Sequence, residues 1–138
     1  MGRTSRTAFR ARWGEADPLG IVFSPNILSW FDQATHELMR GPDQTIASFM
    51  SETGYAMPIA ECGVRFHAPV YYDDELVVVS TVVDLRKRSF RLDHVLERDG
   101  EPLATGFEVR VVARRDPASG RLEKLEIPER IRAWLAGE

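Results

Sequence analysis

The sequence has a single cysteine, Cys62, and no apolar run long enough to span a bilayer. One cysteine excludes an intramolecular disulfide and is typical of a reducing compartment. The N-terminal segment is basic but lacks the hydrophobic stretch that a secretory signal needs. We therefore expect a cytoplasmic protein without a membrane partner.

No charge of one sign dominates the chain. The chain has 18 lysines and arginines and 21 aspartates and glutamates, so its net charge of -3 argues against nucleic acid as a partner. Glycine-rich phosphate loops are absent, as is a Gly-x-Ser-x-Gly nucleophile elbow. His36, His67 and His94 show no metal-ligand spacing, so we expect surface or packing roles for them, no metal and no cofactor.

What the chain does contain is typical of one soluble globular domain over residues 1–138, with 43% hydrophobic and 28% charged residues. The strongest helix signal begins at Ser24-Pro25, where serine suits an N-cap and proline the first turn. An apolar stripe follows at helical spacing until Gly41-Pro42. Residues 43–53 predict a second, shorter helix, and Pro128 begins an amphipathic tail whose apolar residues we expect to pack on the body.

Five segments predict β-strands by alternation or β-branched content. They are residues 7–13, 57–68, 76–86, 88–98 and 102–113. Asp99-Gly100 is a strong hairpin signal, and tight turns imply antiparallel pairing. A lone long helix must bury its stripe against that sheet, so the fold class is α+β. Cys62, among apolar neighbours in the second strand, is expected to be buried and inert.

The chemistry is concentrated in one loop, Trp-Gly-Glu-Ala-Asp-Pro-Leu-Gly-Ile-Val-Phe-Ser-Pro-Asn over residues 13–26. Asp17 precedes a helix N-terminus, whose unpaired N–H groups and partial positive charge can stabilise an oxyanion. A carboxylate opposite those donors could attack a carbonyl carbon or deprotonate a water. From spacing alone, a turn-forming or capping aspartate is the more ordinary interpretation.

This run resembles the signature of the 4-hydroxybenzoyl-CoA thioesterase family, in which an aspartate, a glycine and an apolar–aromatic pair precede the helix. Trp30-Phe31-Asp32 in the helix, residues 66–76 and Arg88-Ser89-Phe90 are also similar to that family. The resemblance spans roughly residues 7–113. It implies a hotdog fold, in which an antiparallel sheet wraps around one long central helix.

The resemblance also implies roles for individual residues. Asp17 would be the nucleophile or general base, and backbone N–H groups at Phe23 and Ser24 would bind the thioester oxygen. Gly20 would let the loop pass close to the substrate, and Asn26 would lie on the substrate side. Subunits would associate into dimers or tetramers, with active sites at the dimer interface.

Two further groups are candidate substrate contacts. The basic cluster of Arg86, Lys87, Arg88 and Arg91, together with Ser89, could hold coenzyme A phosphates, although basic residues also protect exposed strand edges. Asp32 could bond a polar substituent of the acyl group, or it could be solvated or paired on its helix.

These observations predict an acyl-CoA thioesterase acting on an aromatic or short-to-medium-chain thioester. Ser24 and Ile27 occupy positions where relatives often carry aromatic or histidine side chains, so these residues do not identify the acyl group of the substrate. Acyl-carrier-protein thioesters are an alternative substrate, and a non-catalytic acyl-CoA-binding protein is an alternative function. A hotdog hydratase would need a histidine near the helix, and the loop has none.

Overall fold

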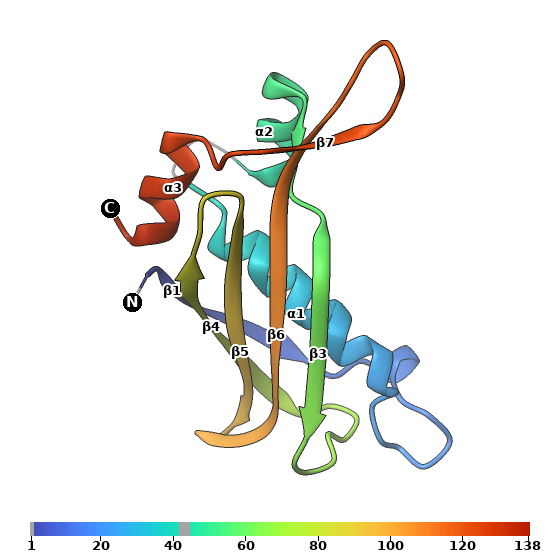
Figure 1. Ribbon diagram of the computed structural model, residues 1–138. Coiled ribbons are helices and arrows are strands. Elements are labelled where there is room, and N and C mark those ends of the chain that lie inside the picture. The colour runs from blue at the N-terminus through green and yellow to red at the C-terminus, as the bar shows by residue number, and fades with distance from the viewer. Residues whose placement is uncertain (1, 42–44) are drawn as a thin grey trace.

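The computed structural model describes residues 2–41 and 45–138. A seven-stranded antiparallel sheet carries one long helix, α1, across one of its faces (Figure 1). The helices are α1 (Ser24–Leu38), α2 (Ile46–Thr53) and α3 (Glu129–Ala136), with a short 3-10 turn at Trp13–Glu15. The strands are β1 (Thr4–Arg10), β2 (Tyr55–Ala56), β3 (Ile59–Phe66), β4 (Glu75–Leu85), β5 (Ser89–Arg98), β6 (Glu101–Arg115) and β7 (Leu122–Leu125).

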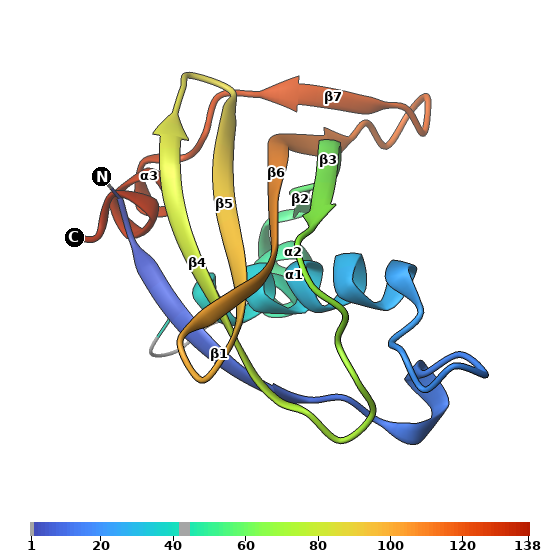
Figure 2. The same cartoon turned by 90° about the horizontal axis from the view of Figure 1, so that it is seen from below.

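The sheet has the order β1-β4-β5-β6, and the long strand β6 pairs with β3 along one part and with β2 and β7 near its end. The four predicted strands after the helix region are confirmed, as is the hairpin at Asp99-Gly100, where both residues have positive φ. Viewed from below, the sheet curves around α1 (Figure 2). The α+β hotdog prediction agrees with this arrangement.

The core lies between α1 and the concave face of the sheet. Alternate residues of β4 and β5 point toward the helix and are buried, as a period of two requires. Opposite them, Phe31 and Ala34 of α1 are fully buried, each large apolar side chain contributing about 1.5–3 kcal/mol. The helix comes so close to β6 that a Cβ at Gly106 would lie 2.5 Å from the Phe31 ring.

Several predicted boundaries were wrong. The first strand covers Thr4–Arg10 instead of residues 7–13, because the chain turns into the 3-10 helix at Trp13. The N-cap of α1 is Phe23 instead of Ser24, with no side-chain capping bond. The second helix begins at Ile46, where Thr45 and Ser48 form a reciprocal cap; residues 43–44 and Pro42, the expected helix stop, lie outside the described residues. The strands β2 and β7 were not predicted.

The strand β3 pairs with β6 alone among the described strands, so its other edge is open. Most of its residues are exposed, because α1 covers little of it. The prediction of a buried Cys62 was therefore wrong: this thiol is exposed.

The tail packs on the body as predicted. Ile131 and Leu135 of α3 are buried, and the Trp134 indole N–H donates to the carbonyl of Leu38 at 2.8 Å. The Arg3 guanidinium lies 3.5 Å above the Trp134 ring.

Among the described residues, no helix is long and apolar enough to cross a membrane.

Candidate active site

Asp17 lies half-buried in the loop between the 3-10 turn and α1. Its Oδ1 accepts the backbone N–H of Leu19 at 2.8 Å and of Ile21 at 3.3 Å. Its carbonyl accepts the N–H of Gly20 at 2.9 Å, and Gly20 has φ +78°, a conformation that favours glycine. Asp17 thus forms the turn, as the ordinary interpretation requires. Its Oδ2 makes no hydrogen bond within the described chain.

The start of α1 offers one of the two predicted backbone donors. The Phe23 N–H is occupied, because it donates to the Glu15 carbonyl at 2.8 Å. The Ser24 N–H has no protein acceptor among the described residues, and the first turn carries neither a side-chain cap nor an acidic residue. The first turn of α1 therefore carries no negative side chain of its own, and its free N–H and the helix dipole favour a developing negative charge.

Asn26 was predicted on the substrate side, but its side chain holds the loop. Its Nδ2 donates to the Glu15 carbonyl at 2.9 Å. The Glu15 carboxylate accepts the Trp30 indole N–H at 2.7 Å. Sequence reasoning did not single out Glu15, because its partners are up to 15 residues away and no periodic pattern reveals them.

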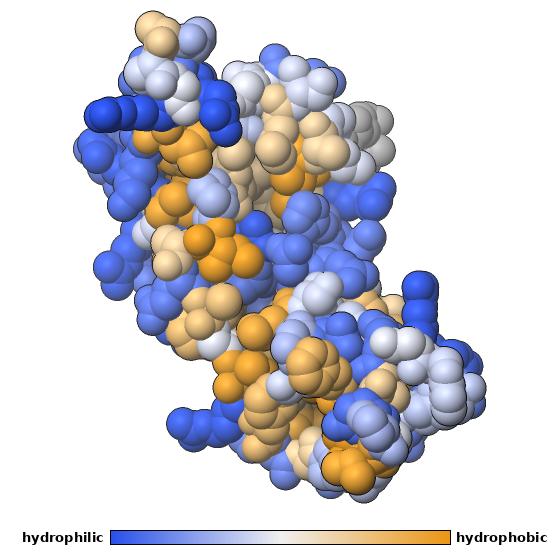
Figure 3. Space-filling view, turned by 90° about the vertical axis from the view of Figure 1, so that its right-hand side faces the viewer, coloured by the Kyte–Doolittle hydropathy of each residue, from blue (hydrophilic) through white to orange (hydrophobic). Residues whose placement is uncertain are grey.

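Exposed aromatic and apolar side chains surround this loop. The Trp13 ring meets the Tyr72 ring edge-on at 5.2 Å, and the Tyr72 N–H donates to the Gly20 carbonyl at 3.1 Å. The rim consists of Trp13, Leu19, Phe23, Tyr71 and Tyr72, all exposed, and Ile21 of the loop bridges to Tyr71. Phe66, the last residue of β3, is also exposed. Apolar side chains gather on the side of the molecule that faces the viewer in Figure 3. The hydration of this exposed apolar surface is unfavourable, so an apolar ligand or partner that covers it would bind favourably.

Asp32 does not lie free in solution. Its Oδ1 accepts a hydrogen bond from the buried Arg110 guanidinium, and His36 lies 3.7 Å from the same oxygen. The Asp32 side chain is nevertheless 45% exposed, so its other face can meet solvent or a ligand. The pairing with Arg110, from β6, was not among the predicted roles.

Beneath Asp32, a buried polar network joins α1 to the sheet. Glu108 accepts hydrogen bonds from Thr35 and from Arg110 (2.6 Å), and His94 Nε2 lies 2.5 Å from its Oε2. His94 Nδ1 contacts the Ser80 hydroxyl at 2.8 Å. Burial raises the pKa of Glu108, but the bond to His94 and the Arg110 charge outweigh it and hold the pKa below its usual value. No member of this network is accessible enough to act on a substrate, so it is structural.

The histidines have the predicted surface and packing roles. His94 is buried and stacks on Phe31, with ring centroids 4.9 Å apart. His67 is exposed and lies 3.0 Å from the Thr105 hydroxyl, and His36 is also exposed. Within the described residues, no group of three potential ligands is arranged to hold a metal ion.

The basic turn, Arg86 to Ser89, connects β4 and β5 beside α3, at the opposite end of α1 from the Asp17 loop (Figure 1). Arg86 pairs with Asp84 at 2.8 Å and Lys87 with Glu126 at 3.2 Å. Arg88 is exposed and forms no ion pair with any described residue, and Ser89 is half-buried at the start of β5. The structure does not bring this turn to Asp17 within one chain.

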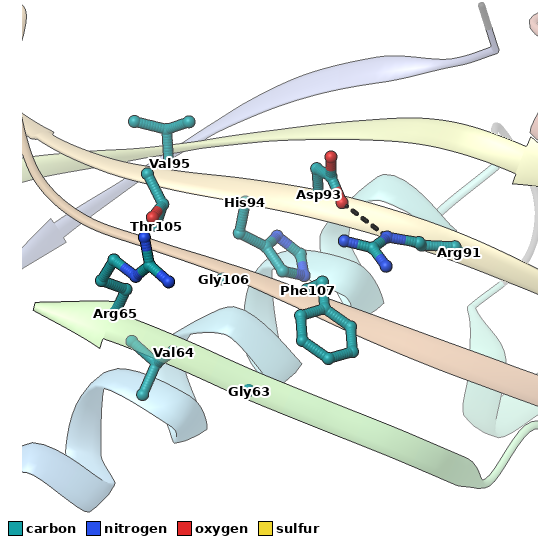
Figure 4. Close-up of a pocket in the computed structure, with 10 residues that line it drawn as sticks. All are labelled: Gly63, Val64, Arg65, Arg91, Asp93, His94, Val95, Thr105, Gly106 and Phe107. Atoms are coloured by element: carbon teal, nitrogen blue, oxygen red, sulfur yellow. Dashed lines mark hydrogen bonds and ion pairs between the residues drawn. The ribbon is translucent and has the colours of Figure 1, made fainter.

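The sheet face opposite α1 carries a shallow hollow of about 460 Å³ (Figure 4). The Arg91 guanidinium lies 4.4 Å from the Phe107 ring centroid and pairs with Asp93 at 2.9 Å. Of the predicted phosphate contacts, Arg91 lines this hollow, and Arg86, Lys87 and Arg88 do not. Of the predicted site residues, Gly20, Phe23, Ser24 and Asn26 lie with Asp17 at the loop, whereas Asp32 and the basic turn lie apart from it.

A curved antiparallel sheet around one long helix, with a loop carboxylate before that helix, defines a hotdog protein. The family model described as the thioesterase-like superfamily matches residues 11–135. The chain therefore belongs to the thioesterase-like superfamily of thioester hydrolases, and the predicted resemblance is confirmed.

Three comparisons illustrate the similarity. The chain is 28% identical to 4-hydroxybenzoyl-CoA thioesterase of Pseudomonas sp. (strain CBS-3), over 93% of this chain and 94% of that protein. It is 26% identical to 1,4-dihydroxy-2-naphthoyl-CoA hydrolase of Synechococcus elongatus, over 90% and 89% of the two chains. A solved gentisyl-coenzyme A thioesterase superposes with a TM-score of 0.82 at 30% identity, over 93% and 99%.

Proposed function

We propose that this protein hydrolyses an acyl-CoA to the free acid and coenzyme A, with Asp17 as nucleophile or general base. The observation that carries the proposal is that Asp17 Oδ2 and the Ser24 N–H, at the two ends of one short loop, both lack protein partners among the described residues. The reaction needs no cofactor, because coenzyme A belongs to the substrate.

The Ser24 N–H would donate to the thioester oxygen and stabilise the negative charge that develops there. Asp17 Oδ2 would then attack the carbonyl carbon and expel the coenzyme A thiolate, leaving an acid anhydride that water hydrolyses. Alternatively, Asp17 would take a proton from a water that attacks directly. Both routes consume one water and release a carboxylic acid and a thiol.

An aromatic acyl group is favoured over a short or medium aliphatic chain. The relatives named above are a hydroxybenzoyl-CoA thioesterase, a dihydroxynaphthoyl-CoA hydrolase and a gentisyl-CoA thioesterase, each with an aromatic acyl group. The exposed aromatic rim around the loop offers rings on which such a group could stack.

The substrate site is proposed to be completed by a second copy of the chain. The open edge of β3 presents unpaired backbone groups beside the aromatic rim, and an edge of this kind pairs readily with another strand. A dimer with paired β3 strands, or a tetramer built from such dimers, would cover both surfaces. The basic turn is proposed to bind the phosphates of coenzyme A, with Arg88 as its unpaired cation.

The test is a panel of acyl-CoAs assayed by release of free thiol. The panel contains benzoyl, hydroxybenzoyl, dihydroxynaphthoyl and gentisyl thioesters together with aliphatic chains from acetyl to palmitoyl. We expect rapid turnover of at least one aromatic member. Turnover of acyl-carrier-protein thioesters alone would replace coenzyme A by the carrier protein, and no turnover of any thioester would contradict the proposal.

A further inference from the structure

We propose that Glu15 is a positioning residue, which sets the distance between Asp17 and the Ser24 N–H without touching the substrate. This inference rests on the proposed function, since it assigns Glu15 to the same reaction. Glu15 lies two residues before Asp17 and contacts α1 at Asn26 and at Trp30.

The Glu15 carboxylate is tied to the protein core. Its Oε2 accepts the Trp30 indole N–H at 2.7 Å, and its Oε1 accepts the Arg12 backbone N–H at 2.8 Å. Trp30 is 2% exposed and stacks on Phe9 with ring centroids 5.8 Å apart. Hydrogen bonds to an ionised carboxylate are among the stronger ones in proteins, so the loop is fixed to a rigid part of α1.

The Glu15 backbone closes the loop on itself. Its carbonyl accepts both the Phe23 N–H at 2.8 Å and the Asn26 side-chain amide at 2.9 Å. Phe23 precedes Ser24 directly, so one residue holds both ends of the segment that carries Asp17 and the proposed oxyanion donor. The bond to Phe23 also leaves Ser24 as the donor that faces outward.

Both carboxylate oxygens of Glu15 accept hydrogen bonds from the protein, and the proposal gives Glu15 no contact with the substrate. Its contribution is geometric. A displacement of about 1 Å between reacting groups can lower a rate by about 100-fold, even when the displaced residue never meets the substrate. The groups proposed to bind coenzyme A lie at the other end of α1, so the effect falls on kcat more than on KM.

The experiment compares Glu15→Gln with a matched control, Glu123→Gln, in the full-length protein. The substitution at Glu15 keeps the size of the side chain but presents one oxygen and one N–H₂ group to two N–H donors. The Glu123 side chain is exposed on β7 and has no hydrogen-bond or ion-pair partner among the described residues. For the best thioester of the panel, we expect Glu15→Gln to lower kcat by about 100-fold with KM changed less than about threefold, and Glu123→Gln to change neither.

A second readout separates positioning from loss of folded protein. In the Asp17→Asn background, Glu15→Gln should cause little further loss, because it acts through Asp17 and effects of coupled residues are not additive. Hydrogen exchange should accelerate at residues 16–24 in Glu15→Gln and stay unchanged in β4 and β5. An unchanged kcat, equal losses in both backgrounds, or unchanged exchange in the loop would overturn the inference. If the wild-type protein hydrolyses no thioester, the proposed function fails, while the exchange measurement still decides whether Glu15 holds the loop.

Discussion

At the scale of single residues, the two carboxylate oxygens of Asp17 have different surroundings. Oδ1 is bound by the loop backbone, and Oδ2 has no partner among the described residues. The turn-forming and catalytic interpretations of this residue are thus compatible, because each uses its own oxygen. The sequence could single out Asp17 because the whole loop is contiguous in the chain.

The Asp17→Asn variant separates the two uses. Asparagine can still accept the Leu19 and Ile21 N–H groups, so we expect the melting temperature to stay within a few degrees. It is neither a nucleophile nor a base, and kcat should fall by about 10³–10⁴-fold. A free-thiol assay measures kcat, and calorimetry measures the melting temperature. Wild-type activity in our variant would remove Asp17 from the mechanism.

Residues whose hydrogen-bond partners are distant in the sequence were not predicted. Glu15 meets Trp30, and Glu108 meets Thr35, 73 positions away. Neither contact follows from local propensity or periodicity, because the first depends on how the loop folds back onto α1 and the second on how α1 lies on the sheet. Arg110 is a further example, since an arginine in a strand is expected at the surface until its partner Asp32 is placed beside it.

Arg88 is the cation of the basic turn with no ion-pair partner among the described residues, so it is the one freest to bind a phosphate. We expect Arg88→Ala to raise KM for the acyl-CoA by about tenfold, equivalent to about 1.4 kcal/mol, with little change in kcat. Arg121→Ala, at an exposed position in the β6–β7 loop, is the control. The effect should vanish with an acyl thioester of N-acetylcysteamine, which lacks phosphates. An unchanged KM would leave the turn with a surface role only.

At the scale of elements, alternation and turn chemistry predicted the four principal strands, but not where β1 begins or that β2 and β7 exist. A two-residue strand such as β2 has no period to detect, and it forms because β6 offers a partner. The exposure of Cys62 was missed for a related reason. Its apolar neighbours predict a covered strand, yet α1 is too narrow to cover β3.

The contact between α1 and the sheet includes Glu108, which makes stability depend on pH. Its pKa is lowered in the folded protein, so its contribution is present above the unfolded value of about 4.5 and is lost as pH falls through the folded value. Glu108→Gln should lower the free energy of unfolding by about 3 kcal/mol at pH 7, because it leaves Arg110 and His94 with an uncharged partner.

Urea unfolding of both proteins between pH 7 and pH 3 tests this assignment. The difference between wild type and Glu108→Gln should be constant near neutral pH and shrink on acidification below about 4.5. The Glu123→Gln variant is again a suitable control, since Glu123 is exposed. A difference that does not change with pH would show that the charge of Glu108 does not support the fold.

At the scale of the whole molecule, the open edge of β3 and the aromatic rim lie on the same side, and both would be covered by one partner. Stable interfaces bury about 800 Å² on each partner, which a strand edge with a flanking apolar rim can supply. We therefore expect the wild-type protein to sediment as a dimer or tetramer of the 15.6 kDa chain.

Cys62→Arg tests this assembly at the middle of β3. The side chain is exposed in the single chain, so arginine should leave the fold intact. In a symmetric pairing of β3 strands, the two arginines would come close to each other, and charged residues on an edge oppose strand pairing. We expect analytical ultracentrifugation to show dissociation toward monomer, together with a loss of thioester hydrolysis.

The control is Leu122→Arg, at an exposed position of β7, which should change neither the mass nor the activity. A Cys62→Arg protein that keeps the wild-type mass would place the interface elsewhere, and a monomer that keeps full activity would show that one chain holds a complete site.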